Sequence, residues 1–280
     1  MEQITYISPK PKRFSWKLRE VWRYRDLVLL LTRKNFTVTY KQTVLGPAWI
    51  VIPPILTSII YVILFNRVVH IGTDGLPPLL FYMCNNAIWG FFSSTVGKTA
   101  TTFVANAAVF GKVYFPRLTV PISDVLVNII KLGIQMVVVL VLLVYFVWRG
   151  ELHPNWISWL FLPLIIVWIG LLGMSVGIMI SSVTTKYRDL SILVSFGIQL
   201  WMYGTPVVYP LSQLPPGVLR TLVLLNPASA PVECFRQALL GGNSTVPLWS
   251  IVLSLVLTAG LFLLSSAVFN RVEKTFMDTV

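Results

Sequence analysis

Six long apolar stretches constrain this chain more than any other feature of its sequence. They lie at approximately 44–65, 77–97, 121–147, 157–183, 190–208 and 247–269. About 20 helical residues, at a rise of about 1.5 Å each, cross the ~30 Å hydrocarbon core of a bilayer. A helix also satisfies its own backbone hydrogen bonds in lipid. We therefore expect an all-α integral membrane protein with six transmembrane helices.

The composition and the terminal segments agree with this interpretation. Hydrophobic residues make up 56% of the chain and charged residues 11%, whereas soluble domains are about a quarter charged. Residues 1–43 are polar, basic and too long for the n-region of a secretory signal, so we expect them to remain as structure. The predicted parts are a cytoplasmic N-terminus (1–43), a transmembrane domain (44–269) and a cytoplasmic tail (270–280).

Lysine and arginine predict the orientation of the chain, because they accumulate on the cytoplasmic side of a membrane. With the N-terminus inside, 17 of the 22 basic residues face the cytoplasm. The predicted outer loops hold only Arg67, Arg149, Arg220 and Arg236, and Lys131 is left within a span. Both termini are therefore expected in the cytoplasm.

The remaining composition excludes several classes of function. The net charge of +12 comes from basic residues whose positions follow the predicted membrane topology. The sequence has no motif that reads a nucleic-acid groove, so nucleic acid is not an expected partner. Cys84 and Cys234 are too few for a disulfide scaffold, and the two histidines have no acidic neighbours, so we expect no metal site. No carboxylate pair or Ser/His/Asp grouping indicates catalysis on this chain.

The tripeptide Gly97-Lys98-Thr99 resembles the end of a phosphate-binding loop. That loop needs a second glycine five residues earlier, where this chain has Phe92, and it follows a short strand rather than a long apolar run. We therefore expect no nucleotide site on this chain. If ATP drives its function, another subunit binds the nucleotide.

Residues 15–41 place apolar and basic side chains at helical spacing. This pattern is typical of an amphipathic helix that lies in the membrane interface, with cations near lipid phosphates. It either only anchors the chain or also forms a cytoplasmic entrance. The apolar positions are Leu18, Val21, Trp22, Leu27, Leu30 and Leu31, and the basic ones are Arg19, Arg23, Arg33 and Lys34.

The segment between the fifth and sixth spans, about 211–241, is moderately apolar but interrupted by prolines. Pro215-Pro216 and Pro231 suit first helical turns and Gly241-Gly242 suits a helix end, which predicts helices at about 216–225 and 229–240. Each is too short to cross a bilayer. We therefore expect a re-entrant hairpin in the outer leaflet, which requires protein or water around it.

Polar residues follow one face of two predicted spans. Either they hydrogen-bond between helices or they line a conduit. Gly173 and Gly177 form a small-xxx-small pattern that indicates close helix packing within the subunit. The polar faces comprise Tyr82, Asn85, Trp89 and Ser93 in the second span, and Ser191, Ser195, Gln199 and Tyr203 in the fifth.

Asp124 and Lys131 are charged residues on one face of the third span, about 10 Å apart along the helix. That separation is too large for a direct ion pair. Asp124, near the cytoplasmic end, either has a function or only reaches the interface. For Lys131, an ion pair with another helix and a role along a transport route remain alternatives.

Several motifs in one order resemble the membrane subunit of ABC exporters of polysaccharides, a family of the ABC-2 type that exports O-antigen, capsule and teichoic-acid chains. The resemblance covers about residues 20–270. The motifs are "YKQTVLGPAWIVIPPIL" (40–56), "GKVYFPRLTVPIS" (111–123), "KYRDL" (186–190), "YGTPVVYPLSQLP" (203–215) and "NP" (226–227).

This resemblance implies a bacterial inner-membrane channel in which two copies of this chain pair with two copies of a separate ATP-binding cassette subunit. ATP and Mg would then lie on the partner, and this chain would carry no cofactor and no enzyme site. The stretch about 100–117 takes the place of the family's coupling helix; a merely solvated loop is the alternative. The implied contacts to the ATPase are Phe110, Lys112, Tyr114, Phe115, Pro116 and Arg117, with Lys186, Arg188 and Asp189 as a second set.

The implied cargo is a glycan carried on a polyprenyl (pyro)phosphate lipid. Aromatic and polar side chains would line its channel, although Trp and Tyr also collect at membrane interfaces. Basic residues would meet the lipid phosphate; Lys131 departs from the family, where an acid often stands. The implied lining is Tyr82, Asn85, Trp89, Ser93, Gln199, Trp201, Tyr203 and Tyr209, and the implied phosphate contacts are Arg23, Arg25, Arg33 and Lys41.

Other functions remain open alternatives. An ABC exporter of drugs or small lipids would need a closed cavity rather than a continuous tunnel. A secondary carrier should show inverted repeats and several midplane ionisable residues, whereas only Lys131 qualifies. A membrane glycosyltransferase should carry acidic catalytic clusters, and the sequence has none.

Overall fold

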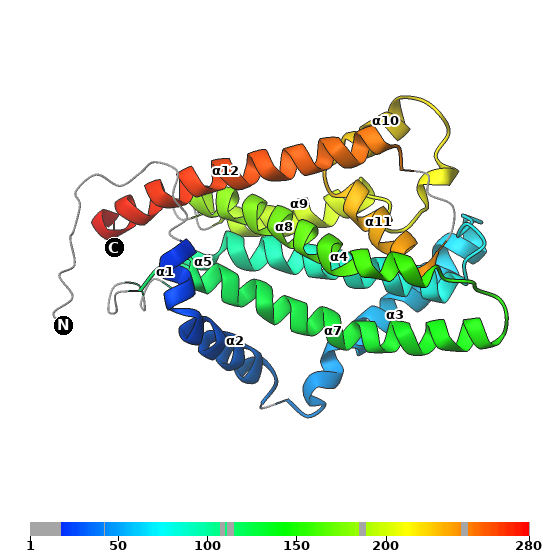
Figure 1. Ribbon diagram of the computed structural model, residues 1–280, viewed down its shortest axis with the longest axis horizontal. Helices are drawn as coiled ribbons and strands as arrows, with labels where there is room; N and C mark the ends of the chain where they lie inside the picture. The colour runs from blue at the N-terminus through cyan, green and yellow to red at the C-terminus, as the bar shows by residue number, and fades with distance from the viewer. Residues whose placement is uncertain are drawn as a thin grey trace.

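The computed structural model describes residues 18–41, 43–106, 110, 115–184, 189–241 and 246–279. The described chain is helical and contains no strand. Its long helices run side by side along one axis (Figure 1). The helical elements are α1 (Leu18–Arg23), α2 (Arg25–Tyr40), η1 (Gly46–Ile50), α3 (Ile52–Tyr61), the π-helical η2 (Val62–Val68), α4 (Pro78–Ala100), α5 (Thr102–Ala105), α7 (Thr119–Trp148), η3 (Trp156–Phe161), α8 (Leu162–Thr184), α9 (Leu190–Tyr203), η4 (Leu211–Gln213), α10 (Val218–Leu225), α11 (Ser229–Leu240) and α12 (Leu248–Thr279).

Four helical stretches are long and apolar enough to cross a membrane: Gly46–Val68, Thr119–Trp148, Trp156–Thr184 and Leu248–Phe269. They coincide to within a few residues with the predicted first, third, fourth and sixth spans. The second and fifth spans are not confirmed. α4 is long but carries several polar residues, and α9 has 14 residues, which reach only about 21 Å.

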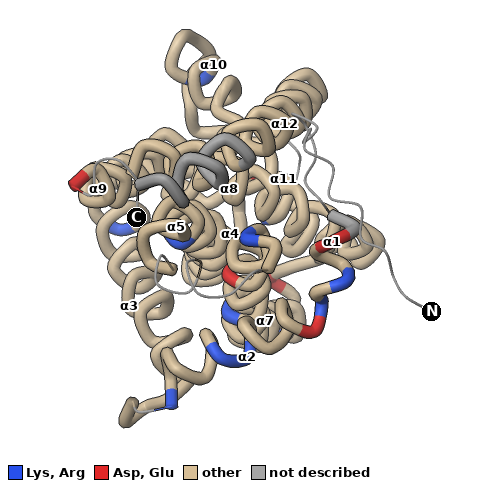
Figure 2. The backbone as a smooth tube through the Cα atoms, turned by 90° about the vertical axis from the view of Figure 1, so that its left-hand side faces the viewer, with Lys and Arg blue, Asp and Glu red and all other residues tan. Residues whose placement is uncertain are grey.

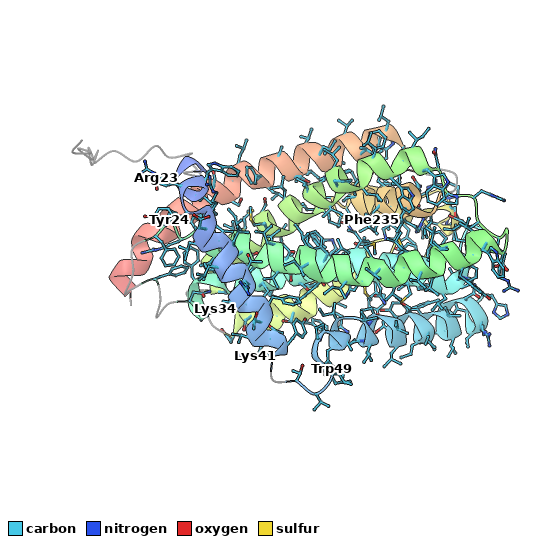
Figure 3. All side chains as sticks on the ribbon, turned by 60° about the horizontal axis from the view of Figure 1, so that its bottom comes forward. Arg23, Tyr24, Lys34, Lys41, Trp49 and Phe235 are labelled. Atoms are coloured by element: carbon cyan, nitrogen blue, oxygen red, sulfur yellow. The ribbon has the colours of Figure 1, made fainter. Side chains whose placement is uncertain are left out.

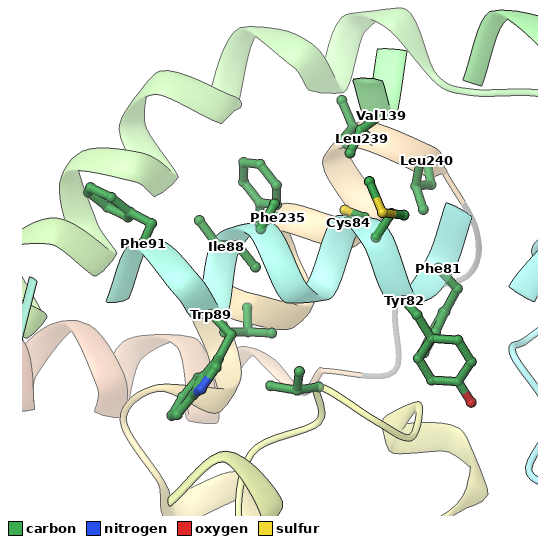
Figure 4. Close-up of a cluster of buried hydrophobic side chains, with 14 of the residues drawn as sticks. Phe81, Tyr82, Cys84, Ile88, Trp89, Phe91, Val139, Phe235, Leu239 and Leu240 are labelled. Atoms are coloured by element: carbon green, nitrogen blue, oxygen red, sulfur yellow. The ribbon is translucent and has the colours of Figure 1, made fainter. Parts of the chain in front are cut away.

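α4 lies at the centre of the bundle, between α8 and α7 and against α3 and α11. Phe81, Tyr82 and Ile88 of α4 are fully buried and belong to one hydrophobic cluster with Phe235 of α11, in which Ile88 is drawn beside Phe235 (Figure 4). A helix that is surrounded by protein does not need an apolar face toward lipid. The burial of α4 therefore explains how it accommodates polar residues such as Asn85.

α8 packs closely on α4 through its glycines. A Cβ atom at Gly177 would lie 2.8 Å from the backbone oxygen of Val96 and 2.6 Å from Cβ of Thr99. At Gly173 it would lie 3.3 Å from the backbone oxygen of Phe92. These contacts agree with the prediction that the small-residue pattern serves packing within the subunit.

α1 and α2 form a helix pair that breaks at Tyr24 instead of one continuous amphipathic helix. Val21 and Val28 are buried against Phe103, Phe115 and their neighbours in a second core. Trp22 and Leu30, which the sequence placed on the same apolar face, are exposed. The pair therefore has one apolar face on the protein and a second that faces outward.

α10 and α11 occupy the positions predicted for the two short helices of the hairpin. The turn between them lies beside α12, because Ser250 donates a hydrogen bond to the backbone oxygen of Leu224 (2.7 Å) and Ser254 donates one to that of Pro227 (2.5 Å). α11 is largely buried, whereas Val218 and Leu222 of α10 are exposed. Whether the hairpin re-enters the membrane stays a prediction.

The start of α1 and the end of α12 lie at the same end of the bundle, opposite α10 and α11 (Figure 1). Viewed from this end, basic residues gather on α1, α2, α4 and α7 (Figure 2). The side of the membrane on which both termini lie stays a prediction.

We predict that Gly177→Ala lowers the stability of the bundle by about 1–3 kcal/mol, because the added methyl group would meet the α4 backbone. Thermal unfolding of the purified chain in detergent measures the effect. Gly97→Ala is the matched control, since no atom lies within 4 Å of its added Cβ. Equal unfolding midpoints for the two variants would contradict the close packing of α8 on α4.

Candidate functional site

α3 and α9 flank one side of α4, and each carries exposed side chains. The hydroxyl of Tyr61 in α3 approaches the sulfur of Met202 in α9 at 3.7 Å, and Asn86 of α4 donates to Ser58 of α3 at 3.3 Å. Exposed apolar side chains cover both flanking helices. They are Leu56, Ile59, Ile60, Ile63 and Leu64 on α3 with η2, and Ile192, Leu193, Phe196 and Leu200 on α9.

α9 also exposes a polar stripe at four-residue steps, formed by Ser195, Gln199 and Tyr203. The hydroxyl of Ser195 donates to the backbone oxygen of Ser191 (3.1 Å), one turn earlier on the same helix. A glutamine amide that faces hydrocarbon loses its water hydrogen bonds at a cost of roughly 2–7 kcal/mol. In a membrane, this stripe therefore needs water or another protein surface beside it.

The structure places Tyr82, Asn85 and Trp89 in the interior of the subunit rather than on a passage. Tyr82 and Asn85 are 0% exposed. The Asn85 amide donates to the backbone oxygen of Val207 (2.8 Å), and Ser93 donates to that of Gly90 (3.2 Å). The prediction that these residues line a channel is thus corrected, because their helix is the buried centre of the bundle.

The remaining aromatic residues join α9 to its neighbours. The rings of Trp201 and Phe92 meet edge to face with centroids 5.2 Å apart. The hydroxyl of Tyr209 donates to the backbone oxygen of Tyr203 (2.9 Å). Trp201 and Tyr209 are half-buried, and Tyr203 is exposed at the end of the polar stripe.

Asn226, the first residue of the "NP" motif, connects α9 to the hairpin. Its side-chain oxygen accepts hydrogen bonds from the Trp201 indole (2.9 Å) and the backbone amide of Ala228 (3.0 Å). Its amide donates to the backbone oxygen of Gly204 (2.8 Å) and to the hydroxyl of Thr205 (2.9 Å). The motif therefore has a structural role that its sequence alone did not reveal.

Glu233 and Arg236 form a buried ion pair within α11 that the sequence analysis missed. Nη2 of Arg236 donates to Oε1 of Glu233, and both side chains are almost fully buried. The guanidinium carbon also lies 4.6 Å from the ring centroid of Phe81 in α4. The spacing of three residues in "ECFRQ" could have signalled the pair, but counting basic residues placed Arg236 in an outer loop.

The expected coupling segment is packed inward where the structure describes it. Phe110 and Phe115 are buried with ring centroids 5.7 Å apart, and the guanidinium of buried Arg117 lies 5.7 Å from the Phe110 centroid. Pro116 is also buried. These side chains anchor the segment and do not form the exposed docking surface that we expected. Lys112, Tyr114, Lys186 and Arg188 lie outside the described residues, and Asp189 is exposed before α9.

The basic residues expected at the lipid phosphate are exposed on α1 and α2. Arg23, Lys34 and Lys41 follow the length of this helix pair (Figure 3), and Arg25 and Arg33 are also exposed. A groove of about 570 Å³ runs along α2 between cationic and apolar side chains. It is lined by Leu29, Leu30, Arg33, Lys34, Thr37, Val38 and Lys41.

Asp124 and Lys131 both meet α2 across its contact with α7. The amide of Asn35 donates to Oδ1 of Asp124 (3.3 Å), and the ammonium of Lys131 lies 6.0 Å from the ring centroid of Tyr40. Tyr40 lies outside the spans, and burial raises the pKa of its phenol. In the described residues no cluster of His, Cys, Asp or Glu is able to hold a metal ion.

We predict that Asn226→Ala costs about 2–3 kcal/mol of stability, because it leaves the Trp201 indole and neighbouring backbone groups without partners. The tryptophan emission should also shift as α9 loosens from the hairpin. Thermal unfolding followed by fluorescence tests both effects. Asn66→Ala, which removes a single hydrogen bond to Ile71, is the control; a similar loss in both variants would contradict the connecting role of Asn226.

We also predict strong non-additivity at the buried ion pair. Glu233→Leu or Arg236→Met alone leaves an uncompensated buried charge and should cost about 3–5 kcal/mol, whereas the double variant should cost much less. A double-mutant cycle of unfolding midpoints in detergent measures the difference. Additive single effects would show that the two charges do not depend on each other.

Comparison with known proteins identifies the family. Residues 26–240 match the ABC-2 type transporter family. The chain is 27% identical over 256 residues to an O-antigen export system permease protein of Klebsiella pneumoniae, covering 90% of this chain and 94% of the relative. It is 28% identical over 214 residues to a protein of the same name from Myxococcus xanthus, covering 75% and 78%. The matched residues include α2, the central helix α4 and the hairpin, and the chain therefore belongs to the ABC-2 type transporter family.

Proposed function

We propose that this chain is the channel-forming membrane subunit of an ATP-driven exporter that moves lipid-linked polysaccharide out of the cytoplasm. The proposal is supported by relatives that are named as O-antigen export permeases and match nearly the whole chain. As a multi-pass protein with basic residues at one end, it would lie in the bacterial inner membrane with both termini in the cytoplasm.

The polar stripe on α9 is the observation that carries this proposal. Ser195, Gln199 and Tyr203 are exposed on a helix whose other exposed residues are apolar. Such a stripe is stable in a membrane beside water or another polar surface, and a hydrated passage provides both for a glycan.

A single copy does not enclose a passage at this surface, because α3 and α9 are open on the side away from α4. We infer that a second copy closes it, giving a symmetric homodimer with the α3 and α9 faces inside. The aromatic residues Trp201 and Tyr209 would then support the wall of the passage from within the subunit, and Tyr203 would contact the glycan.

The opposite end of the proposed route lies at α2. Its exposed cations stand beside exposed apolar side chains, which suits a polyprenyl phosphate whose tail stays in lipid. Arg23, Arg25, Arg33 and Lys41 would attract the phosphate, and the groove along α2 would guide the lipid toward the passage.

The energy would come from a separate ATP-binding cassette subunit, present in two copies, which holds ATP and Mg. Its docking site would lie at the end of the bundle where Phe110, Phe115 and Arg117 pack against Phe103 and α1. Because Phe110 and Phe115 share one buried cluster with side chains of α7, α8 and α12, a movement of these residues would be transmitted to those three helices.

We predict that Gln199→Leu reduces glycan export by at least about tenfold, equivalent to ~1.4 kcal/mol of barrier, because it turns part of the wall apolar. Export of lipid-linked glycan by proteoliposomes that contain this chain and its ATPase measures the effect. Gln213→Leu, at an exposed glutamine in η4, is the matched control and should retain activity.

Normal export by the Gln199→Leu variant would show that the α9 stripe does not line the transport route. Transport of small lipids or drugs without any glycan export would instead favour the alternative ABC exporter. Glycan transport by this chain alone, without ATP, would contradict the proposed partner.

A further inference from the structure

A cavity of about 850 Å³ lies between α8, α11 and α12, on helices that the proposed passage does not use. Its size falls in the range of roughly 300–1,000 Å³ that is typical of small-molecule sites. Its apolar walls include Leu164, Val167, Ala238, Leu255, Ala259 and Phe262. Leu164, Val167 and Leu255 are exposed, so the cavity is a groove open to whatever surrounds the helices.

Most of the polar side chains that line this groove gather at one end. His153, Asn155, Ser158 and Gln237 lie where η3 meets the end of α11. Each of these side chains carries a hydrogen-bond donor, and none of the described residues that line the groove is Asp, Glu, Lys or Arg.

The hydroxyl of Thr258 in the middle of the groove already has hydrogen-bond partners. The Trp168 indole donates to the hydroxyl of Thr258 (3.1 Å), which itself donates to the backbone oxygen of Ser254 (2.7 Å). The groove thus changes from hydrogen-bond donors at one end to hydrocarbon along the rest, which matches the polarity of an amphiphile.

The length of the groove matches one leaflet of a membrane. Along α12 its lining extends from Ile251 to Phe262, a rise of about 16 Å, or half of the ~30 Å hydrocarbon core. Its polar end lies at the same end of the bundle as α10, away from the termini (Figure 1). In the proposed orientation this end faces the outer surface.

We propose that the groove binds one glycerophospholipid of the outer leaflet. One acyl chain lies along Val167, Leu255 and Ala259, and the ester and phosphate oxygens accept hydrogen bonds from Ser158 and Gln237. The amide of Gln237 also donates to Oε1 of Glu233 (3.3 Å). The lipid therefore wedges between α12 and α11 and contacts the helix that carries the buried ion pair.

The test uses the full chain in nanodiscs that contain phosphatidylcholine with a photoreactive diazirine in the middle of one acyl chain. Peptide mapping after illumination should show labelling concentrated on Leu164, Val167 and Leu255. Ala259→Trp, which fills the groove, should reduce this labelling by at least about tenfold, because each displaced methylene is worth about a fourfold change in affinity.

Val256→Trp is the matched control, since Val256 is exposed on α12 but does not line the groove, and its labelling should match the unmodified chain. Ala259→Leu should give an intermediate loss of labelling. This smaller substitution shows whether the effect of Ala259→Trp comes from filling the groove or from misfolding. Uniform labelling of all lipid-facing helices would overturn the proposal, because it would indicate bulk lipid only. Cross-links between two copies of the chain through Val167 or Leu255 would also overturn it.

Discussion

The close approach of α8 to α4 is the contact on which the rest of the structure depends. Gly173 and Gly177 let the two backbones meet, and this contact holds α4 in the centre of the bundle with α7, α3 and α11 around it. A central helix surrounded by protein accommodates asparagine and serine that lipid would reject. The same burial removes Tyr82, Asn85 and Trp89 from any passage, whereas Ser195, Gln199 and Tyr203 of α9 are exposed.

Apolar length, proline position and small-residue spacing predicted the features that depend on local sequence. Four long apolar helical stretches, the two hairpin helices and the glycine contact of α8 follow from them. Features that depend on partners distant in sequence were not predicted. Periodicity shows that Tyr82 and Asn85 share a face, but it does not show that α11 and Val207 cover that face. For the same reason Arg236 was placed in a loop, although it is buried with Glu233.

The hairpin connects the separate parts of the molecule. Asn226 fixes its turn to the end of α9, the ion pair in α11 packs against α4, and Gln237 reaches the groove beside α12. A structural change in the lipid groove or in α9 would therefore affect the hairpin that contains α11. In the proposed exporter, the buried cluster around Phe110 would link the membrane helices to the ATPase.

Water accessibility of the α9 stripe in the membrane tests the central claim most directly. In a chain whose Cys84 and Cys234 are replaced by alanine, Ser195→Cys and Gln199→Cys should react with a membrane-impermeant thiol reagent during ATP turnover. Leu255→Cys, in the proposed lipid groove, should stay unreactive. If the two α9 positions remain unmodified while the transporter exports its cargo, the stripe does not face water and the proposed passage lies elsewhere.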